Sequence, residues 1–385
     1  MMTIPWTPTK LSEVLEPISR SEAVDPVKEY RLLGVRLGGG GAFHRETKRG
    51  SQISAKALSL VRTGDFIYSR LFAWRGAFGV IGSELDGCYV SGEFPTFMPV
   101  PGKLDVEFLR LWFCLPTTIS RVEADCTGST PLTRNRFKEH FFLAMEIPLP
   151  SLEEQRRIVA RIEELAAKID ETRNLRYKAI EQTASFVSSV HLYLAATRTV
   201  ALGDILLLDE QREPVTPGRE YPQVGIKGFG GGLFLKPAVS FTDTTYKTFN
   251  RLYAGALVLS QVKGWEGAVA VCPPELAGSY ASPEYRTFRC ANGKVLPEYL
   301  AFVAVTPWFW TKLKTLTRGV GARRERTRPE RFLEMKMEMP TLENQKKGLL
   351  AFQGVDPLKH LQAETAAELD ALLPSILDKA FKGGL

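Results

Sequence analysis

Self-similarity at an offset of 191 residues constrains the fold of this chain more than any other feature of its sequence. Without a gap, residues 11–118 superpose on residues 202–309, with 32 identities in 108 positions. A fixed offset of this kind is the signature of a duplicated structural unit. The sequence therefore predicts two copies of one fold within its 385 residues.

The matching blocks continue through nearly the whole chain. EYRLLGVRLGGGGAF (29–43) faces EYPQVGIKGFGGGLF (220–234), and GCYVSGEFPTF (87–97) faces GSYASPEYRTF (278–288). After one residue of slippage, FLAMEIPLPSLEEQ (142–155) faces FLEMKMEMPTLENQ (332–345). In the first part of each copy, glycine and proline interrupt short runs of β-branched and aromatic residues, which is typical of strands and turns with a few helices. We therefore expect two α+β globules.

A long amphipathic helix is expected to close each copy. Ser151 and Glu154 have the spacing of a helix-starting capping box. The apolar residues that follow recur at intervals of 4, 3 and 4, the seam of a coiled coil: Ile158, Ile162, Leu165 and Ile169. No strong breaker appears before about Arg198, and the roughly 45 residues from Ser151 would reach about 65 Å if straight.

The second helix starts at Thr341 and has a weaker pattern. Residues 354–357 interrupt it, and Pro374 is expected to kink or open it. Its predicted apolar face is Leu358, Leu361, Leu369, Leu372 and Ile376. The duplication favours pairing of the two long helices with each other, although burial as ordinary core helices or pairing with partner helices stays open. We predict a first head at 1–150, a first spacer helix at 151–198, a second head at 199–340 and a second spacer helix at 341–385.

Composition and motifs exclude several classes of function. With 44% hydrophobic and 24% charged residues and no long apolar run, the chain is expected to be globular and not to span a membrane. It lacks a P-loop, GxSxG, HExxH and EF-hand motif, and the glycine runs 38–41 and 230–232 are interpreted as turns or close-approach loops. Five cysteines without a CxxC pair and four scattered histidines favour neither a disulfide framework nor a metal site. We expect no catalytic residue, no metal and, without a signal peptide, a cytoplasmic location.

Positive charge is concentrated in one stretch. Residues 312–331 contain eight basic and two acidic residues, a net charge of +6 out of +7 for the whole chain. Arginines recur at the same place in the first copy. Arginine binds phosphate and guanine edges through two hydrogen bonds, so the stretch suits nucleic acid, although a solvated face or a web of salt bridges is the alternative.

Comparison of the copies separates scaffold positions from variable ones. The identical pairs include Ser69/Ser260, Trp74/Trp265, Gly76/Gly267 and Tyr89/Tyr280. The pairs whose side-chain chemistry differs include Arg70/Gln261, Arg75/Glu266, Arg45/Lys236 and Gln52/Asp243. Arginine prefers guanine and glutamine prefers adenine in the major groove, so such exchanges would let the two heads read different sequences. The predicted DNA contacts are Arg45, Arg70, Arg75, Arg134, Arg136, Lys138, Lys236, Gln261, Lys263, Arg323, Arg324, Arg326 and Arg328.

These features resemble one family. The helix-entry blocks PLPSLEEQRRIV (148–159) and MPTLENQKK (339–347), the ending LPSILDKAFKGGL (373–385) and the block GDFIYSRLFAWRGAFGVI (64–81) are similar to the specificity subunit of Type I restriction-modification systems. The resemblance covers essentially the whole chain. It implies two α+β target recognition domains separated by two long antiparallel coiled-coil helices, each domain reading one half of a split asymmetric DNA site.

The resemblance also implies the partners. Double-stranded DNA, two adenine methyltransferase subunits and ATP-driven restriction subunits would bind a non-catalytic specificity subunit of this kind. S-adenosylmethionine, ATP and Mg are expected on those partner subunits, with no cofactor bound by this chain. Two alternatives stay open: a coiled-coil adaptor that bridges proteins, and a stand-alone specificity subunit of a methylation-only or related phage-defence system.

Overall fold

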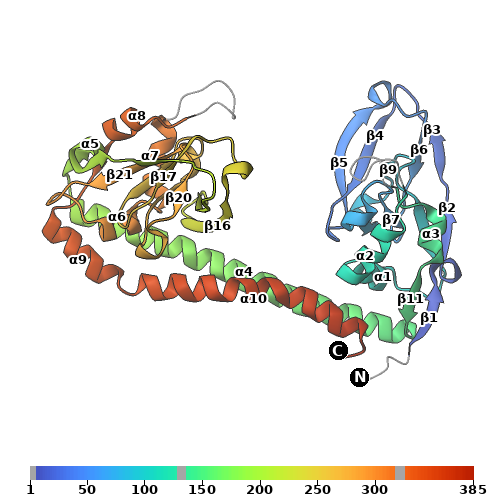
Figure 1. Cartoon of the computed structure of the whole chain (residues 1–385). Coiled ribbons are helices and arrows are strands. Elements are labelled where there is room, and N and C mark those ends of the chain that lie inside the picture. The colour runs from blue at the N-terminus through green and yellow to red at the C-terminus, as the bar shows by residue number, and fades with distance from the viewer. Residues whose placement is uncertain (1–5, 128–135, 317–325) are drawn as a thin grey trace. The chain divides into compact units, whose positions relative to one another are not determined.

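The computed structural model describes residues 6–127, 136–316 and 326–385, and its contacts divide the chain into two compact units. Unit 1 comprises Met1–Arg173 and Thr365–Leu385, and unit 2 comprises Asn174–Glu364. Each unit contains one head and the adjoining parts of the long helices (Figure 1). The four-part division of the chain stays a prediction, because the units group heads with helix segments.

Both heads have the same sheet topology, strand for strand. The first head has sheets of order β1-β11, β2-β10-β7-β8 and β3-β6-β9-β4-β5, and the second has β12-β22, β13-β21-β18-β19 and β14-β17-β20-β15-β16. The predicted duplication and the α+β fold class are therefore confirmed.

The strands of the first head are β1 Thr7–Lys10, β2 Leu15–Ile18, β3 Ser21–Ala23, β4 Glu29–Val35, β5 Ala42–Arg49, β6 Ala57–Leu60, β7 Phe66–Tyr68, β8 Phe78–Val80, β9 Tyr89–Val90, β10 Thr96–Pro99 and β11 Glu146–Leu149. Those of the second are β12 Thr199–Ala201, β13 Leu206–Leu208, β14 Gln211–Pro214, β15 Tyr221–Ile226, β16 Leu233–Val239, β17 Thr248–Arg251, β18 Leu257–Ser260, β19 Val269–Val271, β20 Tyr280–Ala281, β21 Tyr285–Cys290 and β22 Lys336–Glu338. The short helices are α1 Val106–Trp112, α2 Pro116–Ala124 and α3 Glu139–Ala144, then α5 Leu202–Ile205, α6 Pro297–Val303, α7 Pro307–Leu316 and α8 Pro329–Glu334. The long helices are α4 Leu152–Ala195, α9 Leu342–Phe352 and α10 Val355–Phe381.

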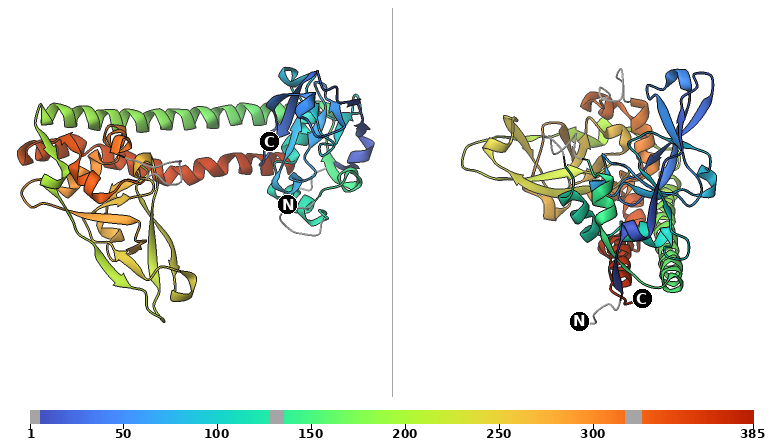
Figure 2. Two further views of the ribbon diagram at one scale, coloured as in Figure 1. Left: turned by 90° about the horizontal axis from the view of Figure 1, so that it is seen from above. Right: turned by 90° about the vertical axis from the view of Figure 1, so that its right-hand side faces the viewer.

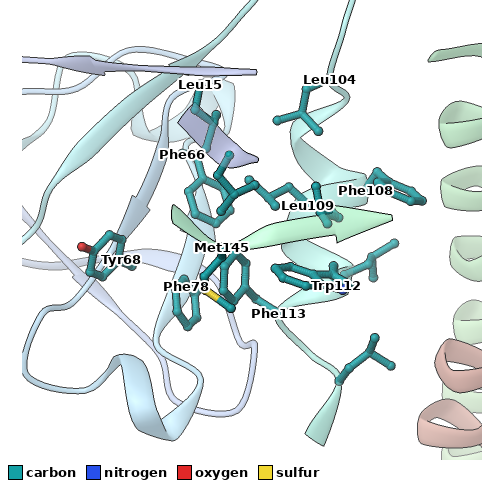
Figure 3. Close-up of a cluster of buried hydrophobic side chains, with 14 of the residues drawn as sticks. Leu15, Phe66, Tyr68, Phe78, Leu104, Phe108, Leu109, Trp112, Phe113 and Met145 are labelled. Carbon is teal, nitrogen blue, oxygen red and sulfur yellow. The ribbon is translucent and has the colours of Figure 1, made fainter. Parts of the chain in front are cut away.

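The core of each head lies between its four-stranded sheet and its short helices. In the first head this core is aromatic, with rings such as Phe66, Phe78 and Phe113 fully buried (Figure 3). The positions equivalent to these three rings hold Leu257, Val269 and Ala304, which are also fully buried. The same topology therefore tolerates a change from aromatic to aliphatic packing, because apolar contacts specify a core by pattern and volume more than by identity.

Helix α4 is a single uninterrupted helix (Figure 2). Its start is as predicted, since the Ser151 hydroxyl accepts a hydrogen bond from the Glu154 amide at 3.3 Å. In unit 1 the predicted seam residues Ile158 and Ile162 are buried in one cluster with the end of α10. Arg157 there donates to the carbonyl oxygen of Leu385 at 2.8 Å, and Arg173 pairs with Asp370 at 3.2 Å, so the two helices run antiparallel within this unit.

The apolar face predicted for the second helix is wrong in part. Leu358, Leu361 and Leu372 are exposed and Leu369 and Ile376 are half-buried. The buried side chains of the described part of α10 are Val355 at its start and Leu377, Ala380 and Phe381 at its end. The reason is that the last turns of α10 pack on the first head, which turns a neighbouring face of the helix inward. The interruption expected near Gly354 is present between α9 and α10, and α10 continues through Pro374.

One buried glutamine ties each long helix to its head. The Gln155 side-chain oxygen accepts from the Asp105 amide at 2.8 Å, and its nitrogen donates to the carbonyl oxygens of Lys103 and Pro150, both at 2.9 Å. Gln345 makes the equivalent bonds to Leu296, Lys294 and Pro340. Both glutamines are fully buried, so the last residue of the repeated S/T-L-E-E/N-Q pattern is a structural joint.

We predict that Gln155→Leu lowers the free energy of unfolding of unit 1 by about 2–4 kcal/mol. The leucine fills the space but leaves one buried amide and two carbonyl groups without partners, and unsatisfied buried groups are costly. Chemical denaturation followed by circular dichroism measures the change. Glu163→Ala, an exposed change on the same helix, is the matched control, and a loss of less than about 0.5 kcal/mol for Gln155→Leu would contradict the proposal.

His191 joins α4 to the second head. Its ring is fully buried, with nitrogen–oxygen distances of 2.9 Å to the Tyr299 hydroxyl and 3.0 Å to the Glu338 carbonyl. Burial lowers the pKa of His191 to about 4, against the opposing effect of Glu338. Because the folded state resists protonation, its stability is complete above the unfolded pKa of about 6.5 and falls as the pH drops from there towards 4.

Unit 2 should therefore lose about 1 kcal/mol of stability between pH 7.5 and pH 5.5 through His191 alone. His191→Gln removes the titrating group, so the part of the pH dependence that is due to this residue should disappear. Denaturation curves at the two pH values test this, with the exposed His140→Gln as control. An unchanged pH dependence in His191→Gln would show that the ring does not carry the effect.

Candidate nucleic-acid interface

Several predicted contacts are brought together by three backbone segments in each head. In the first head these are the β4–β5 loop 36–41, the segment 69–76 after β7, and residues 136–138 before α3. The Gly38 amide donates to the Arg75 carbonyl at 2.8 Å, and the Phe137 amide donates to the Arg70 carbonyl at 3.0 Å. In the second head, Phe229 donates to Glu266 at 2.6 Å and Thr327 to Gln261 at 2.9 Å. The segments that carry Arg70, Arg75, Arg136 and Lys138 are thus neighbours, as are their counterparts.

Glycine residues allow these backbone segments to approach each other closely. Gly76 and Gly267 have φ angles of +76° and +73°, in the left-handed region that favours glycine. A Cβ atom on Gly76 would lie 3.2 Å from the backbone of Gly38, and one on Gly267 would lie 2.6 Å from the Trp310 ring. The glycine runs are therefore close-approach loops, as predicted from the sequence.

Arg136 and Arg326 are both held by internal carboxylates. Arg136 pairs with Glu93 at 2.9 Å, and Arg326 pairs with Glu284 at 3.1 Å, two glutamates related by the repeat offset. In the first head the backbone of Arg136 also bridges Thr127. Each arginine is half-exposed but largely neutralised, which is the salt-bridge alternative raised for the basic stretch.

Arg70 and Gln261 differ in how firmly they are held. The Arg70 guanidinium bonds to Glu139 and to the Gly92 carbonyl, and the bond to Glu139 raises the pKa of Arg70. Burial alone would raise the pKa of Glu139, but the bond from Arg70 and the helix backbone lower it. In the second head proline stands at the position of Glu139, at the start of α8, and the Gln261 side chain has no hydrogen bond within the described residues. Gln261 is therefore free to turn towards a ligand, whereas Arg70 must first leave its carboxylate.

The other predicted contacts fall into two groups. Arg45 pairs with its neighbour Glu46, and Lys263 lies 3.6 Å from Glu266. Among the predicted contacts, the exposed cations that form no ion pair with another described residue are Arg75, Lys138, Lys236 and Arg328. The side chains of Gln52 and Asp243 accept hydrogen bonds from the backbone amides of Arg49 and Ser240, each at the start of a short 3-10 turn. Both residues therefore have a structural role. Arg134, Arg323 and Arg324 lie outside the described residues.

One pair of cations was missed by the sequence comparison. Arg36 lies over the Phe43 ring at 4.5 Å, and its counterpart Lys227 lies over Phe234 at 5.4 Å. Both precede the glycine-rich loop, where their amides close the hairpin through Gly41 and Gly232. The signal that would have found them is a basic residue and an aromatic residue kept at the same offset in both copies. These four residues add a cation and a ring to each candidate interface.

Known proteins share both sequence and fold features with this chain. Residues 45–182 match the family model described as Type I restriction modification DNA specificity domain. Over these residues the chain is similar to the DNA specificity domain of this family. The resemblance stated from the sequence is thereby confirmed for these residues.

Solved structures extend the likeness in fold to the whole chain. The HsdS subunit from Thermoanaerobacter tengcongensis is 22% identical with a TM-score of 0.51, over 99% of this chain and 97% of that one. A chain from a structure described as the structural basis of complex assembly and conformational transition of the type I R-M system is 21% identical with a TM-score of 0.65, over 100% of both chains. No curated protein sequence matches the chain.

Two further properties concern all of the described residues. Within the described ranges, no helix is both long and apolar enough to cross a membrane. No three or more His, Cys, Asp or Glu side chains of that same part of the chain gather into a group that could hold a metal ion.

We predict that the salt dependence of DNA binding separates free cations from paired ones. Lys138→Met should reduce the slope of log K against log salt by about one on a duplex of random sequence, because it removes one phosphate contact. The double variant Arg136→Met with Glu93→Gln removes a neutral pair and should leave the slope unchanged. Fluorescence anisotropy at several salt concentrations measures both. A fall of one in the double variant would make Arg136 a phosphate contact, and an unchanged slope in Lys138→Met would remove Lys138 from the interface.

Proposed function

We propose that this chain is the DNA-sequence-reading specificity subunit of a Type I restriction-modification complex, with each head reading one half of a split asymmetric site. The observation that carries the proposal is one scaffold, present twice with the same topology, on which the residues at the interface differ between copies. A split site with unlike halves needs two readers of equal shape and unlike contacts. The match of residues 45–182 to a DNA specificity domain supports DNA as the ligand.

The predicted contacts take roles within this proposal. Arg75, Lys138, Lys236 and Arg328 would bind phosphates or bases, since no internal carboxylate of the described residues neutralises them. Gln261 would read a base in the second head, and Arg70 would do so in the first by exchanging Glu139 for a guanine edge. Arg134, Arg323 and Arg324 remain proposed contacts from the sequence alone.

Protein partners are supported by the surface of α4. In unit 2 this helix exposes Leu175, Tyr177, Ile180 and Phe186, with Tyr177 63% exposed. Large apolar side chains gathered on one helix indicate a protein-binding surface. We propose that the two methyltransferase subunits bind along the long helices and that restriction subunits join that complex. Catalysis and the binding of S-adenosylmethionine, ATP and Mg would belong to those subunits.

Methylome sequencing tests the proposal. Cells that express this chain with a Type I methyltransferase subunit should acquire adenine methylation at one split motif, on both strands. Because each head reads one half, Gln261→Arg should change one half of the motif and Arg70→Gln should change the other. No new methylation would contradict the proposed function, and an unchanged motif in both variants would contradict the reading roles of these two residues.

Two other functions predict different results. A protein-bridging adaptor would bind DNA without the steep salt dependence that phosphate contacts produce. A stand-alone subunit of a methylation-only or related phage-defence system would give the split methylated motif without restriction of unmodified phage DNA.

A further inference from the structure

Phe229 is held in a backbone conformation that disfavours its side chain. Its φ is +54°, and among the described residues only one other non-glycine residue, Ala196 just after α4, has a positive φ. A bulky residue in this region costs about 1–2 kcal/mol. The equivalent residue of the first head is Gly38, with φ of +63° and open space at its Cβ position. Backbone stability therefore favours glycine at this position, yet the second head carries phenylalanine.

The ring faces solvent beside the candidate interface of the second head. It is 69% exposed, although its edge contacts Trp310 at 5.6 Å between centroids. The Phe229 amide donates to Glu266, at the end of the segment that contains Gln261 and Lys263. The loop thus holds an exposed aromatic ring next to residues proposed to bind DNA.

Two lysines lie on the same β15–β16 hairpin as this ring. Lys227, two residues before it, and Lys236 on β16 lie over the Phe234 ring at 5.4 and 5.8 Å. Neither lysine forms an ion pair with a described residue. An exposed aromatic ring on the same hairpin as two lysines without ion pairs is the combination that binds bases beside their phosphates. The ring also borders a hollow of about 580 Å³ lined by α4 and α7 residues, so a protein partner is the competing occupant.

We propose that Phe229 inserts its ring into the base stack of the half-site bound by the second head, while Lys227 and Lys236 contact the flanking phosphates. Apolar wedges of this kind partly unstack one base step and bend the duplex. The first head has Gly38 at the equivalent position, so it offers no aromatic ring there for such an insertion. This inference rests on the proposed function and adds that the two heads contact their half-sites differently.

The test uses the complex with its methyltransferase subunits and a duplex that carries the motif found by methylome sequencing. 2-Aminopurine replaces one base at a time in each half-site, except at the methylated adenines, because a methyltransferase flips its target base out of the stack. Its fluorescence should rise at one step of one half-site on binding of the unmodified protein. Phe229→Gly should abolish this rise and weaken binding about tenfold, the loss expected for one stacking contact. Phe229→Trp should retain the rise, and Phe241→Ala, another exposed ring of this head, should change neither quantity.

Stability gives the second measurement. Phe229→Gly relieves the backbone, so its melting temperature should stay equal or rise. If the unmodified protein finds no motif, the proposed function itself fails. If it binds the motif and Phe229→Gly leaves both fluorescence and affinity unchanged, the insertion is wrong while the function stands. A fall in melting temperature would make the ring a packing residue of Trp310, and loss of methyltransferase binding would make it a protein contact; either result overturns the insertion.

Discussion

The buried glutamine at the start of each long helix is the interaction on which the rest of this architecture depends. A head and a helix are joined here by a single covalent crossing, β11 to α4 or β22 to α9, which alone would leave their relative direction free. Gln155 and Gln345 each make two hydrogen bonds that link the first turn of the helix to the loop before a short helix of the head, and a third to the proline that precedes the long helix. Because hydrogen bonds are directional, they fix an angle that apolar contacts alone would leave adjustable. Equivalent hydrogen bonds thus constrain the direction in which each helix leaves its head in both copies.

One polar cluster is kept in both copies, whereas part of the apolar packing differs between them. Lys28 lies over Tyr30 and Tyr89 and bonds to Glu22 in the first head, and Arg219 has the same relation to Tyr221, Tyr280 and Glu213 in the second. Three aromatic core residues of the first head, Phe66, Phe78 and Phe113, are meanwhile replaced by aliphatic residues in the second. A buried polar group needs a partner at one place and angle, whereas an apolar group needs only volume. This difference explains why the cluster is kept while those apolar positions change.

Sequence comparison predicted the duplication, the start of α4 and the close-approach glycines because each depends on local pattern or on a fixed offset. It failed for α10, where the buried face is set by the head that the helix packs on and not by the periodicity of its own leucines. It also missed Glu93, Glu284 and Glu139, the partners of Arg136, Arg326 and Arg70, which lie 43, 42 and 69 residues away along the chain. Such partners depend on tertiary placement. Glu93 and Glu284 are nevertheless identical across the repeat, so the offset carried a signal for that pair.

These ion pairs change what the net charge of the chain means. An arginine neutralised by its own head releases no counterion on binding, so the net charge of +7 is not a measure of affinity for DNA. The residues available to bind phosphates are the smaller set of cations without internal ion-pair partners. The residues available to distinguish bases are those whose identity differs between the two copies. Arg136 and Arg326, paired alike in both heads, belong to neither set. Gln261, unpaired among the described residues and different from its counterpart, meets the condition proposed for a reader. Phe229 is exposed and also differs from its counterpart Gly38, so it meets the second criterion.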